Sequence, residues 1–207
     1  MAGYDDDLRF AHVLADAADD ITSRRFRALD LRVEAKPDLT PVTDADHACE
    51  ESLRNVLRRA RPRDAVLGRR WWAAREGGAW TGRSLTKATR CRVSSVGRLA
   101  DASLSYSSLS DWEAGGRLDG FLDLARSVWR TRAYGDFWSH VLVAEGAVDV
   151  SAEPEVSLWD LAALQVIVEE AGGTFTDLGG RPTPDGGSAV ASNGLLHTEV
   201  LKKLTRR

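Results

Sequence analysis

The sequence predicts an α/β fold in which helices and short strands alternate along the chain. Three observations support this class. Apolar residues recur at three- and four-residue steps in several stretches, short runs typical of strands lie between them, and Gly or Pro marks most of the breaks. At 207 residues, with 43% hydrophobic and 29% charged residues, the chain is long enough for a substantial core. We therefore expect a single domain over residues 1–207.

The first third of the chain predicts a helix, an extended segment, a loop and a second helix. The first helix covers about residues 6–25, and alternating apolar and charged residues predict extended structure over residues 29–34. Residues 36–46 are expected to form a loop stiffened by two prolines. In this loop Thr43 is a natural N-cap for the next helix, with Asp46 three residues later.

The middle of the chain is predicted to contain mainly strands. Residues 65–68 suit a short buried strand, and residues 69–80 suit a hairpin that turns at Gly77-Gly78. Further strands are expected at residues 91–93 and 104–106.

The second half of the chain alternates between the two kinds of element. Helices are predicted at residues 117–129, 137–144 and 195–204, and strands at residues 132–134, 147–150, 174–176 and 189–191.

Residues 153–173 are the most informative stretch. Pro154 fixes an extended approach, so a helix should begin by Asp160, and Gly172-Gly173 supply the residues that commonly end one. Asp160 then falls in the first helical turn, where unpaired N–H groups and the helix dipole favour negative charge. Local pattern leaves two interpretations open: a favourable first-turn residue, or a metal-binding carboxylate beside a phosphate-binding helix end.

Composition excludes several classes of function. A net charge of −3 argues against a general nucleic-acid binder, because no basic excess is present to neutralise phosphates. No apolar run approaches the length of a membrane span, and the acidic start at Asp5–Asp7 is unlike a signal peptide. Cys49 and Cys91 are too few for a disulfide framework or a zinc site, so we expect a cytoplasmic protein.

Five carboxylates deserve to be weighed as members of one cleft. Carboxylates that converge repel one another unless a cation lies among them, and Mg²⁺ prefers oxygen ligands when the substrate is a phosphate. The alternative for each of them is an ordinary surface role. They are Asp44, Asp46, Asp136, Glu153 and Asp160.

Three sequence motifs carry a resemblance to a known family. The motifs Val42-Thr43-Asp44-Ala45-Asp46, Trp159-Asp160-Leu161-Ala162-Ala163 and Glu169-Glu170-Ala171-Gly172-Gly173 resemble the inositol monophosphatase family. Three further motifs are similar to its actinobacterial histidinol-phosphatase branch: Arg132-Ala133-Tyr134-Gly135-Asp136, Ala144-Glu145-Gly146 and Ser192-Asn193-Gly194-Leu195-Leu196-His197. The similarity runs from about Leu8 to Leu204.

The resemblance implies a fold and an activity. The expected architecture is layered α/β/α/β/α, of the inositol monophosphatase and sugar phosphatase type, in a homodimer. The expected cofactor is Mg²⁺, and the expected partner is a small phosphorylated substrate rather than a nucleic acid or a membrane. In the complete protein, attack by a metal-activated water would hydrolyse L-histidinol phosphate to L-histidinol and phosphate, a step of histidine biosynthesis. Inositol 1-phosphate or another small phosphate ester is the competing substrate.

The resemblance also implies roles for six residues. Asp160 matches a carboxylate on the second metal, and Asp46 matches the aspartate that, with a threonine of another motif, orients the attacking water. Glu153 matches a substrate-side carboxylate and would suit the cationic amino group of histidinol. The remaining substrate-binding candidates are Asp136, Asn193, placed near the imidazole, and Lys36, placed near the metal cleft.

Two of these assignments have plain structural alternatives. Asp136 could be a helix N-cap, and Asn193 could simply tolerate a turn at Asn193-Gly194.

One block of the family pattern is absent. In the family, the strand that matches residues 65–68 is followed by two glutamates and then by an Asp-Pro-Ile/Leu-Asp-Gly-Thr motif, which supplies the main metal carboxylates and the threonine. Here Arg69-Arg70 follows Gly68, and that motif does not occur. We therefore predict an internal deletion between Gly68 and Arg69 that leaves the central region incomplete. Unpaired sheet edges favour an omitted segment over a naturally shortened protein.

The absent block has a direct consequence for activity. Without these ligands the 207-residue chain is expected to have little or no phosphatase activity. The alternative interpretation is a catalytically inactive family member that serves as a binding or dimerisation module.

Overall fold

The computed structural model describes residues 2–26, 28, 30, 32–35, 41–60, 70–84 and 87–205. The chain splits into two compact units, Met1–Arg70 (unit 1) and Trp71–Arg207 (unit 2). The predictions for Lys36, for a strand at residues 65–68 and for the Gly68–Arg69 junction lie outside the described residues. The assignment of residues 1–207 to one domain stays a prediction.

Unit 1 is a pair of helices with a small β-hairpin between them in sequence. Its elements are α1 (Ala2–Arg25), β1 (Val33–Ala35), β2 (Pro41–Thr43) and α2 (Asp44–Ala60). The two strands pair antiparallel, with Val33 opposite Thr43, and α1 packs against α2. Both predicted helices are confirmed. The loop expected over residues 36–46 is wrong at its end, because β2 pairs with β1 and so satisfies its backbone groups in a ladder.

Unit 2 contains two sheets. The first is an antiparallel sheet in the order β3-β4-β5, and the second is a mixed sheet in the order β7-β6-β8-β10-β9. Its strands are β3 (Trp71–Ala74), β4 (Gly78–Ser84), β5 (Lys87–Arg90), β6 (Ser103–Ser105), β7 (Arg130–Arg132), β8 (Val150–Glu153), β9 (Thr174–Thr176) and β10 (Ala189–Ser192). Its helices are the 3₁₀ turn η1 (Leu99–Asp101), α3 (Leu109–Ala114), α4 (Leu118–Ser127), α5 (Asp136–Ala144), α6 (Leu158–Glu170) and α7 (His197–Leu204).

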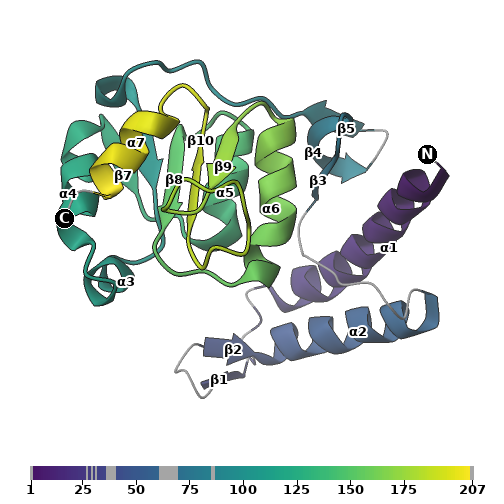
Figure 1. Ribbon diagram of the computed structural model, residues 1–207. Helices are drawn as coiled ribbons and strands as arrows, with labels where there is room; N and C mark the ends of the chain where they lie inside the picture. The colour runs from purple at the N-terminus through teal and green to yellow at the C-terminus, as the bar shows by residue number, and fades with distance from the viewer. Residues whose placement is uncertain are drawn as a thin grey trace. The chain divides into compact units, whose positions relative to one another are not determined.

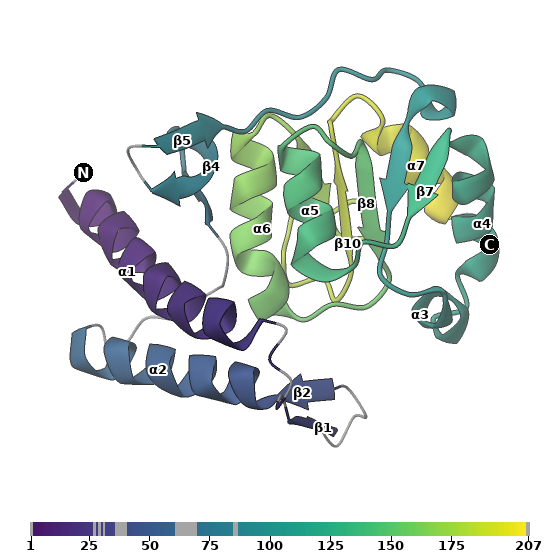
Figure 2. The same ribbon diagram turned by 180° about the vertical axis from the view of Figure 1, so that it is seen from behind.

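The elements of unit 2 stack as layers. Helices α4 and α7 lie on one face of the five-stranded sheet, and α5 and α6 lie on the other (Figures 1 and 2). Helix α6 also contacts β3 and β4, so α6 lies between the two sheets. The predicted layered α/β class is confirmed. Among the described residues the β3–β5 sheet has three strands.

Two hydrophobic cores fill the spaces between these layers. Val150 and Ala152 of β8 face the core shared with α4 and α7, which also holds Trp112 and Phe121. The core on the other side contains Phe175 with apolar residues of α5 and α6. Because successive side chains of a strand point to opposite faces, the alternate β8 residues Ser151 and Glu153 face α5 and α6. Both are buried.

Three predicted strands lie elsewhere in the structure, and the one expected at residues 132–134 is displaced to β7, Arg130–Arg132. Residues 91–93 are not a strand, and the strand is instead β5, which continues the β3–β4 hairpin by pairing with β4. The strand expected at residues 147–150 is displaced to β8, where β6 and β10 supply pairing on both sides. Helix α3 and the η1 turn had no sequence signal that we identified. No described helix is long and apolar enough to cross a membrane.

The β3–β4 hairpin is tied to the end of α6. The carboxylate of Glu170 accepts hydrogen bonds from the backbone N–H groups of Glu76 and Gly78, both at 2.8 Å. Strand β3 ends at Ala74 and β4 begins at Gly78, so the turn covers residues 75–77, slightly earlier than the predicted Gly77-Gly78 pair. One side chain thus holds two backbone donors of a tight turn that the hairpin ladder does not satisfy.

His197, at the start of α7, makes the stability of unit 2 depend on pH. Its Nδ1 lies 2.9 Å from Ser192 Oγ and its Nε2 lies 3.0 Å from Thr176 Oγ1, inside the protein. Burial lowers the pKa of His197 to about 4, from an ordinary value of 6.5. The folded state therefore disfavours the protonated ring. The stability that the neutral ring contributes is fully present above the pKa of His197 in the unfolded chain. It is lost as the pH falls towards the lower pKa of His197 in the folded state.

We expect the free energy of unfolding to fall by about 2 kcal/mol between about pH 7.5 and pH 5 because of this residue. Urea denaturation at both pH values measures it. The His197→Asn variant should lose this pH dependence, whereas the exposed-residue control His47→Gln should keep it. Equal pH dependence in wild type and His197→Asn would show that the ring is not the cause.

Candidate active site

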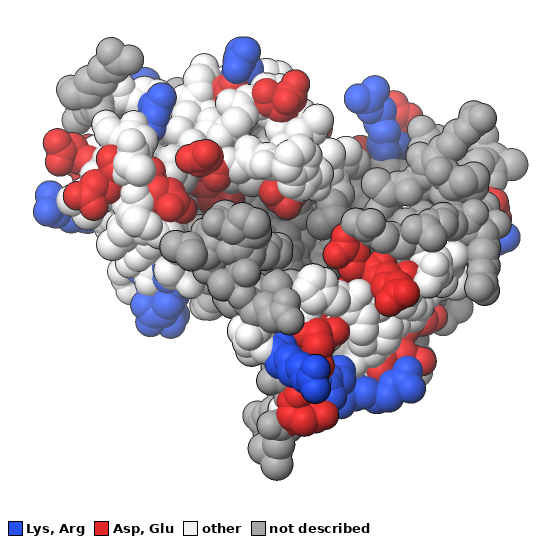
Figure 3. Space-filling view, turned by 90° about the horizontal axis from the view of Figure 1, so that it is seen from below, with Lys and Arg blue, Asp and Glu red and all other residues white. Residues whose placement is uncertain are grey.

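Four candidate or neighbouring residues meet at one edge of the five-stranded sheet. Strand β6 runs parallel to both β7 and β8, so the carboxyl ends of the three strands lie at the same edge. Ser107 follows β6, Asp136 follows β7, Glu153 ends β8, and Asp160 lies in the helix that follows β8. Helices α5 and α6 both begin at this edge (Figures 1 and 2). Figure 3 gives the view from below and shows where Asp, Glu, Lys and Arg side chains lie on the described surface.

Asp136 begins α5 in an unusual backbone conformation. Its φ is +45°, in the left-handed region, and the preceding Gly135 has a φ of +80°. Asp is one of the few non-glycine residues that tolerate this region, and such conformations cluster at functional sites. The backbone N–H of Asp136 donates to Ser107 Oγ at 3.1 Å. Its side chain is exposed and does not act as the N-cap that was its structural alternative, since the cap residue is Gly135.

Glu153 is buried at the end of β8, with 5% of its surface exposed. Ser107 Oγ donates a hydrogen bond to its Oε1, and His140 Nε2 lies 3.6 Å from its Oε2. The second contact is longer than a hydrogen bond, so we treat it as an electrostatic contact. Burial by itself raises the pKa of Glu153, but the imidazole of His140 and the Ser107 hydroxyl outweigh it and hold the pKa below its ordinary value.

Asp160 lies in the first turn of α6, as predicted. It is the third residue after the N-cap Ser157, whose backbone lies in hydrogen-bond contact with the carboxylate. Partial burial and the like charges of Glu153 and Asp136 raise the pKa of Asp160, and the Ser157 contact opposes them. The neighbouring indole of Trp159 is 73% exposed. The negative charges of Asp136, Glu153 and Asp160 therefore repel one another, and a bound cation would reduce this repulsion.

The described residues do not by themselves form a metal site. Among them, no three His, Cys, Asp or Glu side chains are close enough together to hold a metal ion. Asp160 can supply one oxygen ligand, whereas Mg²⁺ demands near-octahedral coordination and otherwise keeps its water. The donor set among the described residues thus fits part of a magnesium site.

Asn193 is not brought to this edge. Strand β10 runs antiparallel to β8, so its end lies at the opposite edge of the sheet, where the Asn193 N–H donates to the Asp149 carbonyl. The Asn193 side chain donates to Ser94 Oγ at 3.0 Å and to the Val96 carbonyl at 2.8 Å. These bonds fix the segment before η1 to the sheet. The predicted substrate contact therefore finds no support in the structure, and the direction of β10 is the reason.

Asp46 belongs to unit 1, at the start of α2. Its Oδ2 accepts from the Thr43 N–H at 2.7 Å, and its own N–H donates to Thr43 Oγ1 at 3.2 Å. This reciprocal pair is a capping box, which confirms the predicted helix start. The catalytic role of Asp46 and the substrate role of Lys36 stay predictions.

Sequence reasoning missed Ser107 and His140. His140 follows Asp136 by four residues, so the two share one face of α5, and this spacing could have pointed to it. Ser107 directly follows a predicted strand. Its role depended on knowing that the strand runs parallel to β8.

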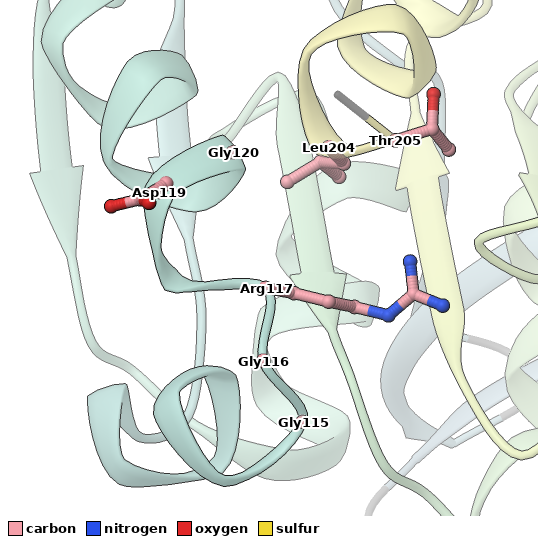
Figure 4. A pocket seen from close by; sticks show the side chains of 7 residues that line it. All are labelled: Gly115, Gly116, Arg117, Asp119, Gly120, Leu204 and Thr205. Carbon is pink, nitrogen blue, oxygen red and sulfur yellow. The ribbon is translucent and has the colours of Figure 1, made fainter. Parts of the chain in front are cut away.

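A pocket of about 410 Å³ lies elsewhere in unit 2. It is formed by the turn between α3 and α4 and by the end of α7, with the Arg117 side chain extending towards Leu204 and Thr205 (Figure 4). Asp119 is its one acidic lining residue. With three glycines in its wall and no buried polar side chain, it offers no grouping of catalytic residues.

Comparison with known proteins gives one family and several close relatives. Residues 66–207 match the model of the inositol monophosphatase family. A histidinol-phosphatase of Streptomyces coelicolor is 52% identical over 265 residues, with 100% of each chain covered. A histidinol-phosphatase of Mycobacterium tuberculosis is 47% identical over 254 residues, covering 96% of this chain and 98% of the relative.

Solved structures share the fold. An inositol monophosphatase from Zymomonas mobilis superposes with a TM-score of 0.77 at 26% identity, with 100% of each chain covered. An IMPase/NADP phosphatase complexed with Mg²⁺ and phosphate has a TM-score of 0.68 at 16% identity and 91% coverage of both chains.

The alignment with the Streptomyces coelicolor relative also measures a difference in length. It has 265 positions and includes the whole of this 207-residue chain, so at least 58 positions, 265 minus 207, hold no residue of this chain.

Proposed function

Because the chain belongs to the inositol monophosphatase family, we propose that the complete protein is a Mg²⁺-dependent phosphomonoesterase that hydrolyses L-histidinol phosphate to L-histidinol and phosphate. The observation that carries this proposal is 52% identity to a curated histidinol-phosphatase across the whole chain. The reaction is a step of histidine biosynthesis. Both cysteines are free thiols, in keeping with a cytoplasmic location.

The acidic edge of unit 2 supports the substrate assignment. L-histidinol phosphate carries an amino group that is cationic at neutral pH, and Asp136 and Glu153 lie where strand ends commonly bind ligands in α/β sheets. We assign Asp136 and Glu153 to this amino group and Asp160 to the metal. The proposal also includes the catalytic role of Asp46, the substrate-binding role of Lys36 and a homodimeric assembly. These three parts rest on the family resemblance alone.

The proposal places the absent segment between Gly68 and Arg69. The 58 or more alignment positions without a residue of this chain are in keeping with an absent segment. The missing metal ligands are assigned to that segment, which agrees with the incomplete donor set around Asp160. The second candidate function, an inactive binding or dimerisation module, is favoured by the same gap and applies if the natural protein lacks the segment.

A substrate panel tests the activity. We define the segment-restored protein as this chain with the corresponding segment of the Streptomyces coelicolor relative inserted between Gly68 and Arg69. With Mg²⁺, its kcat/KM for L-histidinol phosphate should exceed that for inositol 1-phosphate by roughly 100-fold, since a site built for a cationic group leaves its charges unpaired with a neutral polyol. The Asp136→Asn variant keeps a residue type that tolerates the left-handed backbone conformation. It should lower the ratio of the two kcat/KM values. A higher kcat/KM for inositol 1-phosphate would contradict the substrate assignment.

A further inference from the structure

Glu153 is contacted on both carboxylate oxygens by residues from two other elements. Ser107, which follows β6, donates to Oε1, while His140 of α5 places Nε2 3.6 Å from Oε2. The same Ser107 hydroxyl accepts the backbone N–H of Asp136. The orientation of the carboxylate is therefore set by the protein before any substrate arrives.

A packing role alone does not explain why the His140 side chain is fully buried. It is fully buried, and its ring lies 5.9 Å from that of Phe175, centroid to centroid. Neither ring nitrogen makes a hydrogen bond among the described residues. An apolar side chain would fill this place without the cost of burying polar nitrogens. Among the described residues, the acidic group that approaches the ring is Glu153, at 3.6 Å from Nε2.

We propose that His140 and Ser107 are positioning residues that hold Glu153 as an oriented carboxylate for the cationic amino group of the substrate. This inference rests on the proposed function, because it takes Glu153 as the carboxylate that receives that group. Hydrogen bonds at active sites are often long without ligand and shorten in the complex, so the 3.6 Å contact is compatible with a bond formed on binding.

In the described part of the chain, the remaining neighbours of Glu153 supply no competing positive charge. Asp160 from α6 and Asp136 from α5 are both acidic, and the charges of Asp136 and Glu153 act on Asp160. The residue opposite Glu153 on β10 is the apolar Ala189. The lowered pKa of Glu153 agrees with this arrangement, since His140 and Ser107 are the groups that offset its burial.

Two matched variants of nearly equal length separate positioning from packing. His140→Gln keeps an N–H donor near the position of Nε2, whereas His140→Met removes it. In the segment-restored protein, His140→Met should raise KM for L-histidinol phosphate about tenfold with kcat changed less than about threefold, because a bond to a charged group is lost. His140→Gln should stay within about threefold of wild type, and KM for inositol 1-phosphate, which has no cationic amino group, should change in neither variant.

A second measurement uses the 207-residue chain and needs no activity. Carboxyl ¹³C NMR titration should show a higher Glu153 pKa in His140→Met than in His140→Gln, and likewise a higher one in Ser107→Ala than in Ser107→Thr. The Ser107 pair lies outside the fully buried core and keeps the test valid if His140→Met does not fold.

The outcomes separate the two proposals. Equal KM increases for both esters, or a Glu153 titration that none of the variants moves, would overturn the positioning roles. If the folded segment-restored protein hydrolyses neither ester, the proposed activity or the placement of the absent segment fails. In that case the titration of Glu153 still decides whether His140 and Ser107 control its carboxylate.

Discussion

The 207-residue chain is expected to release no phosphate from L-histidinol phosphate above the uncatalysed rate, whereas the segment-restored protein should accelerate release by at least about 10⁴-fold with Mg²⁺. The reason is the donor set. Asp160 alone cannot supply the coordination that Mg²⁺ requires, and no second and third acidic or histidine ligand is close enough among the described residues. A phosphate-release assay with and without Mg²⁺ measures both proteins.

The control for this prediction is the Asp160→Asn change in the segment-restored protein. It removes one charged oxygen ligand while keeping the size of the side chain, so activity should fall by roughly 10²-fold or more and the requirement for Mg²⁺ should shift to higher concentration. Enzyme-like phosphate release by the 207-residue chain would refute the prediction, since the absent block would then be dispensable. An inactive but folded restored protein would instead refute the placement of the gap or the activity itself.

Substituting Gly173 by alanine should cost about 3 to 4 kcal/mol of unfolding free energy in unit 2. A Cβ at this position would lie 2.6 Å from the Ser192 carbonyl oxygen, 2.9 Å from Val168 Cγ1 and 3.0 Å from Val93 Cγ1. The first of these neighbours is backbone of β10 and cannot turn aside. The strand must therefore shift away from α6, which disturbs the core on that face.

Gly97→Ala is the matched control for this second prediction. Nothing lies within 4 Å of a Cβ at Gly97, and its φ is not in the left-handed region, so the change should be neutral within about 0.5 kcal/mol. Urea denaturation followed by tryptophan fluorescence compares the two variants. A loss at Gly173 no larger than that at Gly97 would mean that β10 accommodates the methyl group.

Local signals in the sequence located α6 and the first-turn position of Asp160. Pro154 and the glycine pair bound the helix, and the structure gives Leu158–Glu170 with Gly172 at a φ of +92°. Glycine is needed at the two positions for different reasons, however. Gly172 is needed for its backbone conformation, and Gly173 is needed because β10 approaches closely. Only the first of these reasons is visible in a sequence.

The rest of the candidate site depends on strand direction, which no local pattern encodes. Ser107 and His140 reach Glu153 because β6 and β8 run parallel, and Asn193 is carried to the far edge because β10 runs antiparallel. The misplaced strand at residues 91–93 has a similar origin. Its composition suited a strand, but pairing with β4 begins earlier in the chain, at Lys87. Strand pairing, which the local pattern does not encode, decided the outcome in each case.

The carboxylate of Glu170 has a consequence for how unit 2 opens. It binds two amide protons of the β3–β4 turn from the last turn of α6, and these bonds couple the turn to the helix end. Hairpin ends commonly fray on their own and exchange their amide hydrogens early. Here the slow exchange of α6 should extend to the Glu76 and Gly78 amides, so that hairpin and helix behave as one cooperative folding unit.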